Sequence, residues 1–96
     1  MLVRYDAGMT RGDVTLRELL LGGRKRAGMT QVELMIALEL RQAASVSRYE
    51  TGATIPDPKV FARMISVLGL DADQAWHAWG IAYAERTRQA VEELGD

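Results

Sequence analysis

The 96-residue sequence contains no cysteine and only one histidine, His77. Without cysteine the chain cannot form a disulfide, a thiolate metal site or a cysteine nucleophile. A single histidine also removes most zinc sites and most catalytic triads. We therefore expect no metal and no cofactor, and we expect His77 to be an interface or surface residue.

Long apolar runs are missing too. No segment reaches the length of a membrane span, and residues 1–15 lack the apolar core of a secretion signal. The composition, 48% hydrophobic and 26% charged, is typical of a soluble globular protein. We expect one folded domain in the cytoplasm, without a membrane partner.

The residue types of an active site are not grouped in the sequence. Ser45 and Ser47 have no histidine near them in sequence. Neither a carboxylate pair nor a glycine-rich phosphate loop is present. The sequence therefore predicts a protein that is not an enzyme.

The net charge of −1 argues mildly against a nucleic-acid-binding domain, because such domains are usually basic. The charge is unevenly distributed, however. Residues 1–59 hold nine Lys/Arg and seven Asp/Glu, whereas residues 60–96 hold three and six. The basic excess therefore lies in the first part of the chain. Its densest cluster is 24–26, either a solvated face or part of a binding surface.

Residues 30–52 have the pattern of two short helices joined by a tight turn. Thr30 and Glu33 have the spacing of a capping box, which marks a helix start. The spacing that follows is that of one buried helical face, made by Leu34, Ala37 and Leu38. The phase breaks at 40–42, and Val46 and Tyr49 begin a second helix that stops near Gly52. This layout is that of a helix-turn-helix.

A helix before this stretch and a helix after it are also predicted. Thr15 and Glu18 form another capping box, and the helix that they start should run to about residue 27, with Gly28 ending it. Gly22 and Gly23 inside it indicate either a kink or the close approach of another backbone. Asp57 with Pro58 starts the later helix, and Gly69 ends it.

The last predicted helix begins at the capping pair Asp71 and Gln74 and continues to Leu94. Its 24 residues would span roughly 36 Å, more than a small core needs. The apolar residues Trp76, Trp79, Tyr83, Ala90 and Leu94 share one stripe along it. We expect its first half to pack on the domain and the stripe to form a dimer interface.

These patterns divide the chain into three parts. Residues 1–14 form an N-terminal arm, either a frayed terminus or an arm that contacts a partner subunit or places Arg4 and Arg11 on phosphate. Residues 15–70 form a helix-turn-helix domain. Residues 71–96 form a long C-terminal helix that serves dimerisation.

The chain resembles the phage-repressor and Cro type of helix-turn-helix domains, often called Xre-like. The resemblance covers about residues 16–76, and the residues that carry it are Leu20, Arg24, 28–31, 33–34, 46–50, Gly52, Pro56 and 68–70. It implies an all-α, five-helix bundle of the lambda-repressor-like type, here with an extended C-terminal helix. Members of the family bind operator DNA as dimers, mostly as transcriptional repressors.

The sequence departs from the family pattern at three points, two of them in the predicted turn. Residues 30–50 are one residue longer than usual, so the turn near 39–41 is expected to be enlarged. Glu39 stands at the usual turn glycine. Gly23 stands where the family generally has a core leucine.

The resemblance also implies which residues meet DNA. In such a fold the third helix lies in the major groove, and the implied base contacts are Gln42, Ala43, Ala44, Ser47 and Arg48. Arg48 has the chemistry to bind guanine and Gln42 to bind adenine. The expected phosphate contacts, including those at the start of a helix where free N–H groups favour an anion, are Thr30, Gln31, Arg41, Thr51, Thr54 and Lys59. Arg24 and Glu50 are expected to form a structural ion pair.

The leading hypothesis is a homodimeric, sequence-specific regulator that binds double-stranded operator DNA, and a repressor because no activation region is visible. The alternative is a protein-interaction module, or an antitoxin of a toxin–antitoxin pair, whose C-terminal helix binds a partner protein.

Overall fold

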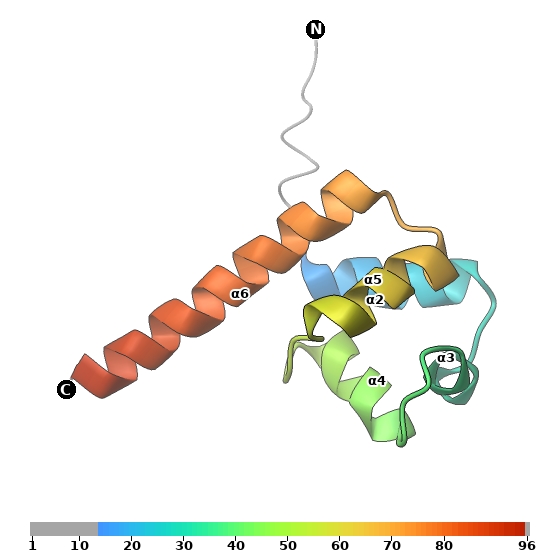
Figure 1. Cartoon of the computed structure of the whole chain (residues 1–96), viewed down its shortest axis with the longest axis horizontal. Helices are drawn as coiled ribbons and strands as arrows, with labels where there is room; N and C mark the ends of the chain where they lie inside the picture. Colours follow the sequence, from blue (N-terminus) through green and yellow to red (C-terminus); the bar gives the residue numbers. More distant parts are fainter. Residues whose placement is uncertain (1–13, 96) are drawn as a thin grey trace, which may run out of the picture.

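A computed structural model of the chain describes residues 14–95. Within that range the fold is all-α, with five helices and no strand, as predicted. The N-terminal arm proposed for residues 1–14, with Arg4 and Arg11, lies outside the described residues except for Val14. Labelled as in Figure 1, the helices are α2 (Leu16–Arg26), α3 (Gln31–Ala37), α4 (Ala43–Thr51), α5 (Pro58–Leu68) and α6 (Ala72–Gly95).

Four of the described helices, α2, α3, α5 and α6, begin at the predicted residues because their caps are local. The Thr15 hydroxyl accepts a hydrogen bond from the backbone N–H of Glu18 at 3.2 Å, and the Glu18 carboxylate accepts one from Thr15 at 3.0 Å. Thr30 and Glu33 make the same reciprocal pair at 3.0 and 2.8 Å. Each pair satisfies two backbone donors that the helix itself leaves unpaired, which confirms both capping boxes.

The later two helices start with single aspartate caps. The Asp57 carboxylate accepts from the N–H of Val60 at 2.9 Å, and Pro58 occupies the first turn, as predicted. Asp71 likewise accepts from the N–H of Gln74 at 3.1 Å. Only this half of the expected Asp71–Gln74 pair is present in the described residues.

One core joins all five helices. Its largest fully buried side chain is Phe61 of α5, and α6 enters the core with two alanines. Burying one leucine or phenylalanine stabilises a fold by about 1.5–3 kcal/mol, so this cluster supplies most of the stability of the domain. Its members are Leu16, Leu20, Leu34, Leu38, Val46, Phe61, Met64, Leu68, Leu70, Ala75 and Ala78. The predicted burial of Ala37 is wrong: this residue, the last of α3, is exposed because only the face that carries Leu34 and Leu38 turns toward the core.

The glycine pair in α2 does not interrupt the helix. Gly23 is buried, and a Cβ atom placed on it would lie 2.9 Å from Cδ2 of Leu70 and 3.4 Å from Leu68. Side chains from the end of α5 therefore occupy the space where the family generally has a leucine. The sequence left two alternatives for this glycine pair, a kink or the close approach of another backbone. Close approach is correct, but the approaching group is a pair of side chains rather than a backbone.

Helix α6 is continuous through Gly80 and projects from the bundle. Its first half covers the other helices through Ala75, Ala78 and the half-buried Trp79, whereas every residue from Tyr83 to Gly95 is exposed. Figure 1 shows this second half, orange to red, extending past the rest of the domain. None of the described helices is long and apolar enough to span a membrane.

Trp79 belongs to the contacts of its own domain. Its indole N–H donates to the carbonyl of Pro56 at 2.8 Å, and its ring lies 6.5 Å from that of Phe61 and 5.2 Å from that of Tyr83. The stripe prediction placed Trp79 in a dimer interface. The structure uses its polar edge and most of its surface within one chain, and its place in a dimer interface stays a prediction.

Candidate nucleic-acid interface

The turn between α3 and α4 starts with a left-handed residue that is not glycine. Glu39 has a φ of 59°. Its N–H donates to the carbonyl of Ile36 at 3.1 Å, and the N–H of Leu40 donates to the carbonyl of Met35 at 3.0 Å. These two bonds form a Schellman motif, which usually has glycine at the position of Glu39. The proposed substitution of glycine by Glu39 therefore matches the observed backbone.

Arg63 of α5 supports this helix end. Its guanidinium donates to the carbonyl of Leu38 at 3.3 Å and lies 3.5 Å from the Glu39 carboxylate. A cation at the C-terminal end of a helix is favoured by the helix dipole. The ion pair itself is exposed and adds little.

Replacing Glu39 with glycine is expected to raise the free energy of unfolding by about 1 kcal/mol, because it relieves the left-handed strain. Urea unfolding followed by circular dichroism would measure the change. Glu39→Ala is the matched control: it loses the same exposed ion pair but keeps the strain, so it should not stabilise the protein. Equal stability of the two variants would contradict this account of the turn.

Helix α4 begins at Ala43, earlier than the Val46 start indicated by the apolar pattern. Gln42 is its N-cap residue and makes no side-chain capping bond. Glutamine is not among the residues that cap helices well. The amide of Gln42, which is exposed, is therefore not engaged in capping α4.

The outer face of α4 is exposed and its inner face is buried. Val46 is fully buried and Tyr49 is partly buried; burial raises the pKa of the Tyr49 phenol, and nearby Asp57 raises it further. On the other side, the sequence-predicted base contacts share one surface. Gln42, Ala44 and Arg48 are exposed, and Ala43 and Ser47 are half-buried. The structure thus brings all five together on and just before one helix.

The predicted phosphate contacts are more scattered. Arg41 and Lys59 are exposed, and Thr54 is half-buried. Two of the threonines already have hydrogen bonds. The Thr51 hydroxyl donates to the carbonyl of Arg48 at 3.2 Å, and the Thr30 hydroxyl caps α3.

Glu50 is the centre of a partly buried polar network. Arg24 donates to both of its carboxylate oxygens, from Nε to Oε2 and from Nη2 to Oε1 at 3.1 Å, and a further Arg24 nitrogen donates to the carbonyl of Met29 at 2.9 Å. The two side chains are only 13% and 6% exposed. The hydrogen bond with Glu50 raises the pKa of the Arg24 guanidinium above its usual value. This pair ties α2 to α4.

Gln31 also belongs to this network. Its side-chain N–H donates to Glu50 Oε1 at 3.0 Å. The resemblance implied a phosphate contact for Gln31, and the structure shows that its amide nitrogen has a protein partner. The basic cluster at 24–26 is likewise divided, since Arg24 is in the network whereas Lys25 and Arg26 are exposed.

Two arginines at the other end of α4 were not predicted. Arg86 of α6 donates to the carbonyls of Gly52 and Ala53 at 3.1 and 3.0 Å, and Arg17 of α2 donates to that of Thr51 at 3.4 Å. These contacts join residues more than 30 positions apart. No local sequence pattern connects them, so only the fold reveals them.

Comparison with known proteins agrees with this geometry. Residues 14–77 match the family described as "Helix-turn-helix domain", and the chain belongs to that family, which is of the Xre/Cro-like type. Membership supports a DNA-binding regulator as the general class, and families of this class are typically not enzymes. Searches of the curated proteins and of the solved structures found no match.

Proposed function

We propose that the protein is a homodimeric, sequence-specific transcriptional repressor that acts in the cytoplasm and places α4 in the major groove of operator DNA. The observation that carries the proposal is the outer face of α4. Arg48 and Gln42, the two residues there with side chains able to pair bidentately with a base, are both exposed beside methyl groups of alanine.

On this surface Arg48 provides most of the base recognition. A guanidinium binds the O6 and N7 atoms of guanine with two hydrogen bonds, and an amide such as that of Gln42 binds adenine similarly. Ala43 and Ala44 offer a surface for thymine methyl groups, and the hydroxyl of Ser47 can pair with any base edge. Each subunit therefore recognises few base pairs, which favours two subunits on one operator.

The predicted phosphate contacts surround the outer face of α4. Arg41 and Lys59 supply the charges, while Thr30, Gln31 and Thr54 supply polar groups. The Thr51 hydroxyl, which donates to the carbonyl of Arg48, contacts phosphate only if it gives up that hydrogen bond. Few cations are available, so affinity should depend less steeply on salt than for a strongly basic domain.

The second half of α6 is the proposed dimerisation element. Tyr83 and Leu94 are 52% and 86% exposed, and Ala90 lies between them on the same stripe. Thr87 completes the stripe at heptad spacing. Its hydroxyl donates to carbonyls of its own helix at 3.1 and 3.0 Å, so its polar group is already satisfied and its methyl group can be buried.

Light scattering tests this interface. The wild-type protein should have twice the chain mass of 10.6 kDa. Ala90→Asp, which places a charge on the stripe of both copies, should give the monomer. Ala84→Asp is the matched control, because Ala84 is an exposed alanine on a different face of the helix. A monomeric wild-type protein, or identical behaviour of both variants, would refute the α6 interface.

A gel shift at two salt concentrations tests DNA binding itself. With a pool of random-sequence duplexes, the protein should shift DNA at low salt and lose affinity as salt rises. Absence of any shift at low salt would remove the proposal.

A protein-interaction module is the second candidate, because α3 exposes apolar side chains. Val32 and Ile36 are 51% and 64% exposed, one helical turn apart. An antitoxin would combine such a surface, or α6, with the same fold. Failure of the gel shift would favour this candidate.

A further inference from the structure

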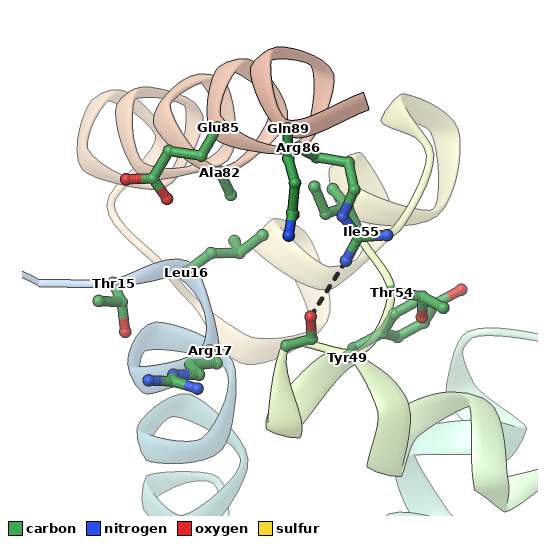
Figure 2. A pocket seen from close by; sticks show the side chains of 11 residues that line it. Thr15, Leu16, Arg17, Tyr49, Thr54, Ile55, Ala82, Glu85, Arg86 and Gln89 are labelled. Carbon is green, nitrogen blue, oxygen red and sulfur yellow. Dashed lines mark hydrogen bonds between the residues drawn. The ribbon is translucent and has the colours of Figure 1, made fainter. Parts of the chain in front are cut away.

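The C-terminal end of α4 is held by the projecting helix. Arg86 is the residue of α6 that reaches it, with hydrogen bonds to two successive carbonyls, those of Gly52 and Ala53. A cleft of about 330 Å³ lies between α6, α2 and the end of α4. Figure 2 shows the Arg86 side chain extending from α6 toward the end of α4. A cation here also faces the negative end of the helix dipole, which favours the contact.

Arg86 is one of two attachments on the same face of α6. Seven residues earlier, Trp79 donates to the carbonyl of Pro56 at 2.8 Å. Both residues donate hydrogen bonds to carbonyls of residues 52–56, the segment that follows α4.

Gly80 lies between Trp79 and Arg86, and a Cβ atom placed there would meet nothing within 4 Å. Glycine permits a wider range of backbone angles than other residues, while the stacked rings of Trp79 and Tyr83 span this position and Ala82 packs on the core just beyond it. Beyond Ala82, within the described residues, Arg86 is the residue whose hydrogen bonds hold the direction of α6 relative to α4.

The direction of α6 matters because the helix is long, so a small change of angle moves its end by a large distance. Leu94 lies about 22 Å beyond Trp79 along the helix axis. A tilt of about 10° would therefore move the end of α6 by about 4 Å, close to the rise of one base pair, about 3.4 Å. Every residue from 83 to 95 is exposed, so packing within the described part of the chain does not restrain this half.

We propose that Arg86 is a positioning residue that fixes the angle between α6 and α4, and thereby the spacing between the two DNA half-sites that a dimer recognises. The inference rests on the proposed function, because a half-site spacing exists only if two copies joined through α6 bind one operator. Arg86 does not touch DNA in this account. It determines where the second α4 is presented relative to the first.

Selection of bound duplexes from a random-sequence pool tests the proposal. Wild-type protein should enrich pairs of one half-site sequence at a single spacing, near one turn of DNA or a multiple of it. Arg86→Gln should enrich the same half-site sequence with the spacing spread over several base pairs. Arg86→Lys keeps the charge but loses the planar guanidinium that can bond two carbonyls at once. It should give a spread of half-site spacings between those of the wild type and Arg86→Gln. Arg88→Gln is the control, since Arg88 makes no hydrogen bond to 52–56 within the described residues, and it should keep the wild-type spacing.

The selection distinguishes failure of the positioning role from failure of the proposed dimeric function. A wild-type spacing in folded Arg86→Gln would overturn the positioning role. Loss of the half-site sequence itself, in both Arg86→Gln and Arg86→Lys, would also overturn it, because Arg86 would then act on α4 directly. A wild-type selection without paired half-sites would instead refute the proposed dimeric function, and the positioning role with it.

Discussion

Replacing Glu50 with alanine is expected to lower the free energy of unfolding by about 3–5 kcal/mol. Arg24 would keep its charge in a site that is only 13% exposed, and its remaining protein partner would be the carbonyl of Met29. Gln31 would lose its acceptor as well. Since small domains have about 5–15 kcal/mol of stability, the variant should lose a large part of its stability and unfold at a much lower temperature. Thermal and urea unfolding would measure the loss.

The exposed pair in the same protein provides the matched comparison. Arg63 and Glu39 lie 3.5 Å apart, with side chains that are 40% and 75% exposed. Glu39→Ala should therefore change stability by no more than about 1 kcal/mol. If Glu50→Ala unfolded at the wild-type temperature, the network would not be a structural element, and Glu50 would be only a surface charge.

Replacing Arg48 with alanine is expected to weaken binding to the selected operator by about 1–3 kcal/mol, roughly tenfold to a hundredfold. The reason is that Arg48 is exposed on the outer face of α4, where it supplies the strongest base contact among the predicted residues. Binding to unrelated duplexes should fall much less, so the ratio of specific to non-specific affinity should decrease. Titrations of both duplexes at one salt concentration would measure this ratio.

Lys59→Ala is the control for this prediction. Lys59 is also an exposed cation, but it is expected to contact phosphate, so its loss should weaken binding to all sequences alike and make the salt dependence shallower by about one unit of slope. Unchanged discrimination in Arg48→Ala, with the fold intact, would contradict the assignment of Arg48 as a base contact.

The parts of the fold that depend on neighbouring residues were predictable from the sequence. Thr15 with Glu18 and Thr30 with Glu33 mark helix starts, because a capping box is complete within four residues. Gly28 and Gly69 end their helices at φ values of 70° and 65°, which glycine adopts without strain. Local chemistry decides these features, so local pattern reveals them.

The start of α4 was harder to predict because two positions depart from local preference. Glu39 adopts a backbone conformation that glycine prefers, and Gln42 occupies a cap position without capping. Departures of this kind are common at functional sites. The apolar pattern detected only Val46 and Tyr49, which lie inside α4, and so placed its start too late.

Contacts between distant segments could not be predicted from local patterns, and the Arg24–Glu50 pair was expected only from the family resemblance. The carbonyl of Pro56 receives the Trp79 indole, and the carbonyl of Gly52 receives Arg86. Periodicity identified Trp79 as part of an apolar stripe, but it does not show which side of a long helix meets its own domain. The bond from Gln31 to Glu50 depends in the same way on the packing of α3 against α4.

Amide chemical-shift mapping by NMR, with labelled protein titrated with duplex DNA at low salt, would locate the DNA-binding surface. The largest changes are expected at residues 42–48, with smaller changes at Thr30 and Gln31 and little change at Val32 or Ile36. Changes confined to the exposed side of α3 or to α6, or no changes at all, would contradict the claim that the outer face of α4 binds DNA.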